Sequence, residues 1–216
     1  MVATSPGKFF YQIYSNFNPS CTLKYFTVPC SRMIRDDYES KTRILGGKPY
    51  SFLQISGKEQ RAQSGSYYND AEAQYIIKLL LVLKSSAKKH NSDEEWYSPE
   101  KVRIITFYQG QVQRIKTLLH KNNLGRVLVA TVDSSQGCEA DLVIVSFVRG
   151  NDKVGGSRQK AGFLTDDRRM NVALTRAKYQ LICIGDGLGT LACSGDATLK
   201  AIVDDAKSRS LVGKVG

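Results

Sequence analysis

The sequence predicts an α/β fold in which helices cover both faces of a parallel sheet. Four short runs rich in apolar and β-branched residues indicate strands, at residues 102–107, 126–132, 141–148 and 179–185. Such continuous apolar runs are typical of strands buried on both faces. Between them lie helical patterns at residues 110–122 and 166–178. Strands that alternate with helices form parallel sheets.

Further elements are expected on either side of this alternation. Residues 50–56 predict a strand, followed by a polar loop. A helix should then begin after Asn69, a plausible N-cap residue, with Glu72 in the capping-box position three residues later. A last, weak helix is expected at residues 196–208.

These patterns divide the chain into three parts. Residues 1–47 have little regular period and stay unassigned, residues 48–187 form the α/β domain, and residues 188–216 form a C-terminal helix and tail. A length of 216 residues fits one domain with an extension.

Composition favours some partners and argues against others. Thirty-one basic residues against 20 acidic ones give a net charge of +11, which favours polyanions such as nucleic acid. No apolar run approaches the roughly 20 residues of a membrane span, so no membrane partner is expected. The five cysteines form no C-x-x-C pair, which predicts reduced thiols, an intracellular protein and no metal site. They are Cys21, Cys30, Cys138, Cys183 and Cys193.

Three segments that follow predicted strands carry candidate chemistry, because ligands of such sheets bind near strand ends. In the first, residues 105–111, Tyr108 could stack on a base and Gln111 could hydrogen-bond to it, although plain packing is the alternative. The second, residues 130–151, places a polar loop between two strands. Its hydroxyls, amides and glycine suit phosphate or ribose oxygens, and an ordinary surface loop is the alternative. The loop contains Asp133, Ser134, Ser135, Gln136, Gly137 and Glu139.

The third segment, residues 162–186, contains two arginines on a predicted helix. Arg169 and Arg176 lie seven residues apart, which puts both on one side of a helix, where they could meet anions. Ordinary surface ion pairs are the alternative. Asp166 and Asp167 suit the start of that helix.

In this order, the three segments resemble motifs IV, V and VI of superfamily 1B helicases, in particular the group that contains the nonsense-mediated mRNA decay helicase and senataxin. VDSSQGCEADLVIVSFVR, residues 132–149, resembles motif V of that group. GFLTDDRRMNVALTRAK, residues 162–178, resembles its motif VI almost position by position, and SGSYYNDAEA, residues 64–73, resembles a segment before motif IV. The resemblance implies a C-terminal RecA-like domain of the P-loop-NTPase type.

The resemblance also implies roles for individual residues. Arg176 matches the arginine finger that reaches the γ-phosphate of ATP on a first RecA-like domain, and Arg169 matches an arginine that bridges to carboxylates of that domain. Glu139 matches the contact to the ribose, with Gln136, Gly137 and Tyr108 also near the nucleotide. The expected nucleic-acid contacts, to RNA or single-stranded DNA, are Asp133, Ser134, Ser135 and Gln111.

Departures from the family pattern limit what the chain can do alone. The phosphate-loop pattern G-x-x-x-x-G-K-[ST] occurs nowhere in the sequence, and Ser31-Arg32-Met33 is a poor counterpart of the family's Q-Y-R-M-H segment. We therefore expect a helicase motor domain that is inactive alone and uses ATP and Mg²⁺ only with a first RecA-like domain, in cis or in trans. The alternative is a stand-alone, non-catalytic module that binds nucleic acid or protein.

Overall fold

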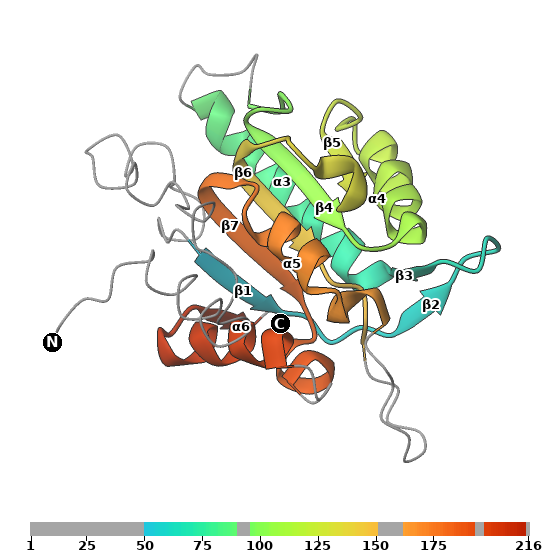
Figure 1. Cartoon of the computed structure of the whole chain (residues 1–216). Coiled ribbons are helices and arrows are strands. Elements are labelled where there is room, and N and C mark those ends of the chain that lie inside the picture. Colours follow the sequence, from blue (N-terminus) through green and yellow to red (C-terminus); the bar gives the residue numbers. More distant parts are fainter. Residues whose placement is uncertain (1–49, 90–95, 151–161, 193–196, 215–216) are drawn as a thin grey trace, which may run out of the picture.

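A six-stranded parallel sheet forms the centre of the molecule (Figure 1). The computed structural model describes residues 50–89, 96–150, 162–192 and 197–214. The strand order is β5-β4-β6-β7-β1-β8, and every neighbouring pair is parallel. The strands are β1 (Tyr50–Gln54), β4 (Val102–Thr106), β5 (Leu128–Thr131), β6 (Ala140–Ser146), β7 (Ala177–Gly185) and β8 (Val212–Lys214). The structure thus confirms the predicted fold class and all five predicted strands.

Helices cover both faces of this sheet, because alternate side chains of each strand point to opposite faces. On one face α3 (Asp70–Lys89) and α4 (Gln109–Lys121) pack on Ile104, Ile144 and Ile182. On the other face α5 (Asp167–Leu174) and α6 (Ala197–Ser208) pack on Ile105, Val145 and Cys183. Two apolar layers therefore enclose the strands, as their continuous apolar runs predicted, and the free thiol of Cys183 is buried in one of them.

Two strand-forming segments were not predicted from the sequence. The polar loop before α3 contains a hairpin of β2 (Glu59–Arg61) and β3 (Tyr67–Asn69), whose turn includes Gly65 at φ 79°. The C-terminal tail supplies β8, which pairs with β1 after α6 has packed on the same core. Residues 197–214 therefore belong to the same packed unit as the sheet.

One predicted helix is shorter in the structure. The pattern over residues 166–178 predicted a helix through Lys178, but α5 ends at Leu174 and β7 begins at Ala177. The last residues of the pattern leave the helix and pair with β6 instead. The N–H of Ala140 donates to the carbonyl of Arg176 at 3.0 Å. Tertiary pairing has overridden helix propensity there.

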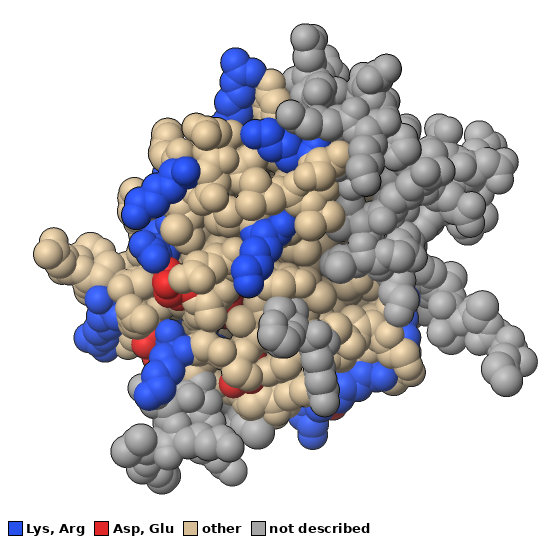
Figure 2. All heavy atoms as spheres, turned by 180° about the vertical axis from the view of Figure 1, so that it is seen from behind, with Lys and Arg blue, Asp and Glu red and all other residues tan. Residues whose placement is uncertain are grey.

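The surface reflects the basic composition. Figure 2 shows lysine and arginine side chains scattered over the rear face, with fewer acidic ones between them. Among the helices that the structure describes, none is long and apolar enough to cross a membrane.

Candidate nucleotide and nucleic-acid site

The loop of the second candidate segment begins where β5 ends. Its first residues, Asp133–Ser135, form a short 3-10 helix. The buried hydroxyl of Ser135 donates to the carbonyl of Thr131 at 2.8 Å, so this serine anchors the loop. Ser134 is exposed, and its N–H donates to the hydroxyl of Thr131 at 3.3 Å.

The rest of that loop lies at the surface. Gln136, Gly137 and Glu139 are exposed, so their side chains and backbone are accessible to a ligand. Gly137 has φ 77°, a conformation that other residues adopt only at an energetic cost. The glycine that the sequence singled out is therefore required by the shape of the loop.

The arginine-bearing helix α5 lies directly against this loop. The carboxylate of Asp166 caps the helix by accepting the N–H groups of Arg168 and Arg169 at 3.0 and 3.2 Å. The Nε of Arg169 donates to Oδ1 of Asp133 at 2.9 Å, which joins the second and third segments. The fold therefore brings together two segments that the sequence predicted to act together.

Arg176 lies outside α5, in the connection to β7, so the expectation that both arginines project from one helix is wrong. Its Nε donates to the carbonyl of Val172 at 3.1 Å, and one terminal nitrogen donates to the hydroxyl of Thr175 at 2.9 Å. The guanidinium group is half-buried and held at the amino ends of β6 and β7. Glu139, the residue before β6, lies at the same corner.

Tyr108 and Gln111 lie at the opposite edge, beyond the carboxyl end of β4. Tyr108 is only 3% exposed, and its ring packs edge-on against Tyr67, with centroids 5.7 Å apart, and beside Phe163 at 5.8 Å. Burial raises the pKa of Tyr108 to about 12. In this conformation Tyr108 offers no open face to a base, which favours the packing alternative.

Gln111 is fully buried and its amide is used internally. Its Oε1 accepts the N–H of Asn69 at 2.8 Å, and its Nε2 donates to the hydroxyl of Ser146 at 2.9 Å. A direct contact from Gln111 to a nucleic-acid strand would require breaking this network. The predicted polar residue is instead a structural link between α4, β3 and β6.

Glu72 lies at the centre of the same network, although its capping-box position predicts a contact with the start of its own helix. Asn69 does cap α3, because its Oδ1 accepts the N–H of Glu72 at 3.3 Å. The carboxyl of Glu72, however, does not accept the backbone N–H of Asn69, as it would in a capping box. It accepts the hydroxyl of Ser146 at 2.6 Å and the N–H of Val148 at 3.0 Å. Burial raises the pKa of Glu72 to about 8.

The strained residue Val148 is held by this network from both sides. It has φ 73°, which is rare for a β-branched residue. Glu72 accepts its N–H, and Nδ2 of Asn69 donates to its carbonyl at 3.1 Å. The next residue, Arg149, is buried, pairs with Glu59 at 3.1 Å and places its guanidinium 4.4 Å from the centre of the Tyr67 ring. The buried network thus sets the end of β6 and docks the β2–β3 hairpin.

Metal binding has no support within the described residues, which include no group of three His, Cys, Asp or Glu side chains able to hold an ion. Three of the cysteines that the sequence prediction considered, Cys21, Cys30 and Cys193, lie outside the described residues.

Comparison with known families matches residues 11–188 to the AAA domain model. The chain belongs to the AAA domain family. The match includes most of residues 1–47, which have little regular sequence pattern, and all three candidate segments.

This AAA domain is similar to curated helicase-related proteins. It is 38% identical over 147 residues to the regulator of nonsense transcripts 1 homolog of Drosophila melanogaster, which covers 64% of this chain and 11% of that protein. It is 32% identical over 188 residues to the ATP-dependent helicase NAM7 of Saccharomyces cerevisiae, covering 84% of this chain and 17% of that protein. These similarities confirm the resemblance drawn from the motifs, and the chain spans only a small part of each relative.

A solved structure is also similar to this AAA domain. It is the C-terminal domain of a possible DNA helicase from Lactobacillus, with a TM-score of 0.44 and 12% sequence identity, over 82% of this chain and 93% of that one.

Proposed function

We propose that this AAA domain is the second motor domain of an ATP-dependent helicase and that Arg176 acts on ATP held by a first RecA-like domain. Family membership and the similarity to a protein named an ATP-dependent helicase support the motor role. The absence of a phosphate-loop pattern from the sequence supports a shared ATP site.

The observation that carries this proposal is that the guanidinium group of Arg176 is oriented by hydrogen bonds but has no acidic partner among the described residues. A guanidinium group has five N–H donors, and the two hydrogen bonds to Val172 and Thr175 leave others available. Within the described part of the chain Arg176 has no acidic partner, whereas Arg169 is paired with Asp133. An oriented, half-buried and unpaired guanidinium suits an incoming phosphate.

ATP supplies the phosphoryl group whose transfer to water would drive the motor. Arg176 would stabilise negative charge on that group, an effect worth on the order of 10³–10⁵ in rate. Glu139, exposed at the same corner, would accept a ribose hydroxyl. Because the described residues offer no cluster for Mg²⁺, the first domain would hold the ion and most of the phosphate oxygens.

The nucleic-acid strand would contact the exposed part of the same loop. Ser134 can donate its hydroxyl to a backbone phosphate, and the N–H groups around Gly137 are accessible. Such contacts carry little sequence information and weaken as salt rises. We therefore expect weak, salt-sensitive binding of RNA or single-stranded DNA.

A reconstitution experiment tests the proposal. The full chain is mixed with a first RecA-like domain that carries a phosphate loop, and RNA-stimulated ATP hydrolysis is measured. We expect hydrolysis that Arg176→Ala lowers about 10³-fold, and that Arg176→Lys also lowers, because lysine lacks the planar fork. Lys116→Ala, at an exposed lysine on α4, is the matched control.

Two outcomes would contradict the proposal. Hydrolysis that Arg176→Ala leaves unchanged would remove the role of that residue. An absence of hydrolysis in every mixture, together with intact RNA binding by the chain, would favour the stand-alone binding module.

A further inference from the structure

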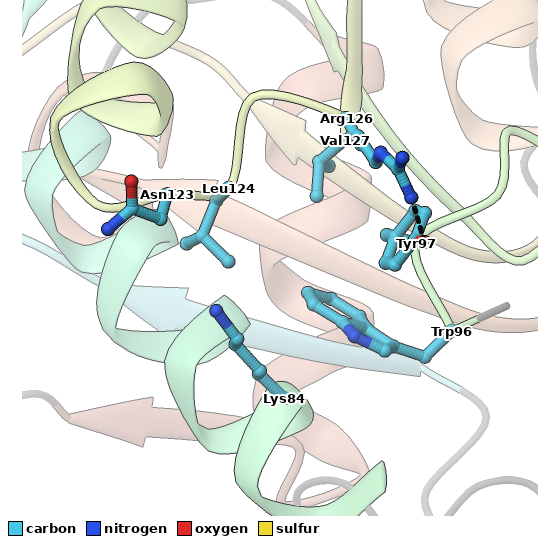
Figure 3. Close-up of a pocket in the computed structure, with 7 residues that line it drawn as sticks. All are labelled: Lys84, Trp96, Tyr97, Asn123, Leu124, Arg126 and Val127. Atoms are coloured by element: carbon cyan, nitrogen blue, oxygen red, sulfur yellow. Dashed lines mark hydrogen bonds between the residues drawn. The ribbon is translucent and has the colours of Figure 1, made fainter. Parts of the chain in front are cut away.

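A hollow of about 250 Å³ opens at the amino ends of β4 and β5, on the sheet face that α3 and α4 cover (Figure 3). It lies away from α5 and the adjoining loop, which pack on the opposite face. The hollow is lined by one residue from α3, two that precede β4 and four between α4 and β5. They are Lys84, Trp96, Tyr97, Asn123, Leu124, Arg126 and Val127.

The walls of the hollow are apolar and partly flat. Leu124 and Val127 are buried and form one wall, while the indole of Trp96 and the stem of Lys84 lie across from them (Figure 3). The rings of Trp96 and Tyr97 pack edge-on at 5.6 Å, which fixes the indole plane. A flat aromatic group could lie between the indole and the aliphatic wall.

The described polar groups at this hollow are basic or neutral. Lys84 and Arg126 contribute positive charge, and none of the lining residues that the structure describes is acidic. Arg126 donates to the hydroxyl of Tyr97 at 2.5 Å and lies over its ring at 5.3 Å, so its guanidinium is oriented and keeps further donors. Asn123 is held at φ 53°, and its carboxamide is exposed and can both donate and accept.

We propose that this hollow binds a single nucleoside monophosphate unit, either as a free nucleotide or within a single strand. The base would stack on Trp96, the carboxamide of Asn123 would bond the base edge, and Lys84 and Arg126 would bind the phosphate. Aromatic stacking next to basic side chains is how proteins hold unpaired nucleotides without reading a long sequence. The volume lies just below the roughly 300–1,000 Å³ of drug-sized ligand sites, which suits one nucleotide.

A nucleotide fits these groups better than an acidic peptide does. A peptide could place one carboxylate near the two cations and bond the carboxamide of Asn123 through its backbone, but its acidic side chain would leave the flat indole face without a matched partner. A nucleotide engages all three kinds of group at once, and its phosphate matches the fork of the arginine.

Trp96 is the only tryptophan in the chain, so its fluorescence reports on this hollow directly. The full chain is titrated with AMP, with adenosine, with an acidic peptide and with an eight-residue oligoadenylate RNA. We expect saturable quenching by AMP, with adenosine binding about tenfold more weakly because it lacks the phosphate. Lys84→Ala should weaken AMP about tenfold and leave adenosine unchanged, with Lys116→Ala as the matched control.

The oligonucleotide separates the two sources of the ligand. Quenching by the RNA, with no further quenching when AMP is added at saturation, indicates a site that accepts a strand, and quenching by AMP alone indicates a free-nucleotide site; either result supports the proposal. Arg176→Ala should leave all of these signals unchanged, so this test is independent of the ATP-site proposal. No quenching by any nucleotide, or quenching only by an acidic peptide, would overturn the proposal that this hollow binds a nucleotide. Equal binding of AMP and adenosine would overturn the phosphate assignment.

Discussion

Replacing the buried Glu72 by glutamine should change how the stability of the fold depends on pH. Glu72 is fully buried and accepts the hydroxyl of Ser146 and the N–H of Val148. Its neutral acid form can keep both contacts, because a serine hydroxyl can accept a hydrogen bond as well as donate one. Glu72→Gln keeps the shape and the neutral charge but cannot ionise.

Linkage gives the sign and size of the effect. Burial raises the pKa of Glu72 from 4.5 to about 8, so the folded state holds the proton more tightly than the unfolded state. The stabilising contribution is fully present below pH 4.5 and is lost as pH rises toward 8. This rise in pKa corresponds to a loss on the order of 5 kcal/mol across that window.

The measurement is urea unfolding followed by circular dichroism at pH 5, 6, 7 and 8 for wild type and variant. The free energy of unfolding of Glu72→Gln, minus that of wild type, should rise steadily with pH by several kcal/mol. Because both proteins share every other titrating group, the difference isolates Glu72. The same substitution at exposed Glu100 is the control. A difference that stays constant from pH 5 to 8, or that falls, would refute the reasoning.

Three further effects can be measured by the same unfolding assay. The Arg169–Asp133 ion pair is partly exposed, so a double-mutant cycle with alanine should give a coupling energy of only about 0.2–1 kcal/mol, and a much larger value would contradict this. Gly137→Ala should cost about 1–2 kcal/mol from backbone strain alone, since nothing lies within 4 Å of an added Cβ. Leu80→Ala, on the buried face of α3, should cost about 2–5 kcal/mol; a cost below 1 would show that the helix packs loosely.

The sheet could be predicted from the sequence because each central strand carries its own apolar run. β8 could not, since Val212–Lys214 has only three residues and gains its place by pairing with β1. The β2–β3 hairpin is similar: its residues are polar, and side-chain contacts such as the Tyr67–Tyr108 ring pair contribute to its packing. Pattern reading misses elements whose stabilising contacts are distant in sequence.

The candidate site was predicted in part, for a related reason. Asn69 and Glu72 were identified as a capping pair, which is a local pattern, and the cap itself is present. The partners of the Glu72 carboxyl, Ser146 and Val148, lie more than 70 residues away, and no local spacing indicates them. Only the approach of α3 to the end of β6 makes that carboxyl a buried link.

The end of α5 shows how this packing bears on the proposed motor role. Thr175 closes the helix by bonding the carbonyl of Asn171, and the next residue, Arg176, already pairs with β6 through its carbonyl. An arginine on an open helix face would lose side-chain entropy on meeting a phosphate, whereas Arg176 is already oriented by Val172 and Thr175. A first RecA-like domain that uses this arginine must therefore approach the amino ends of β6 and β7.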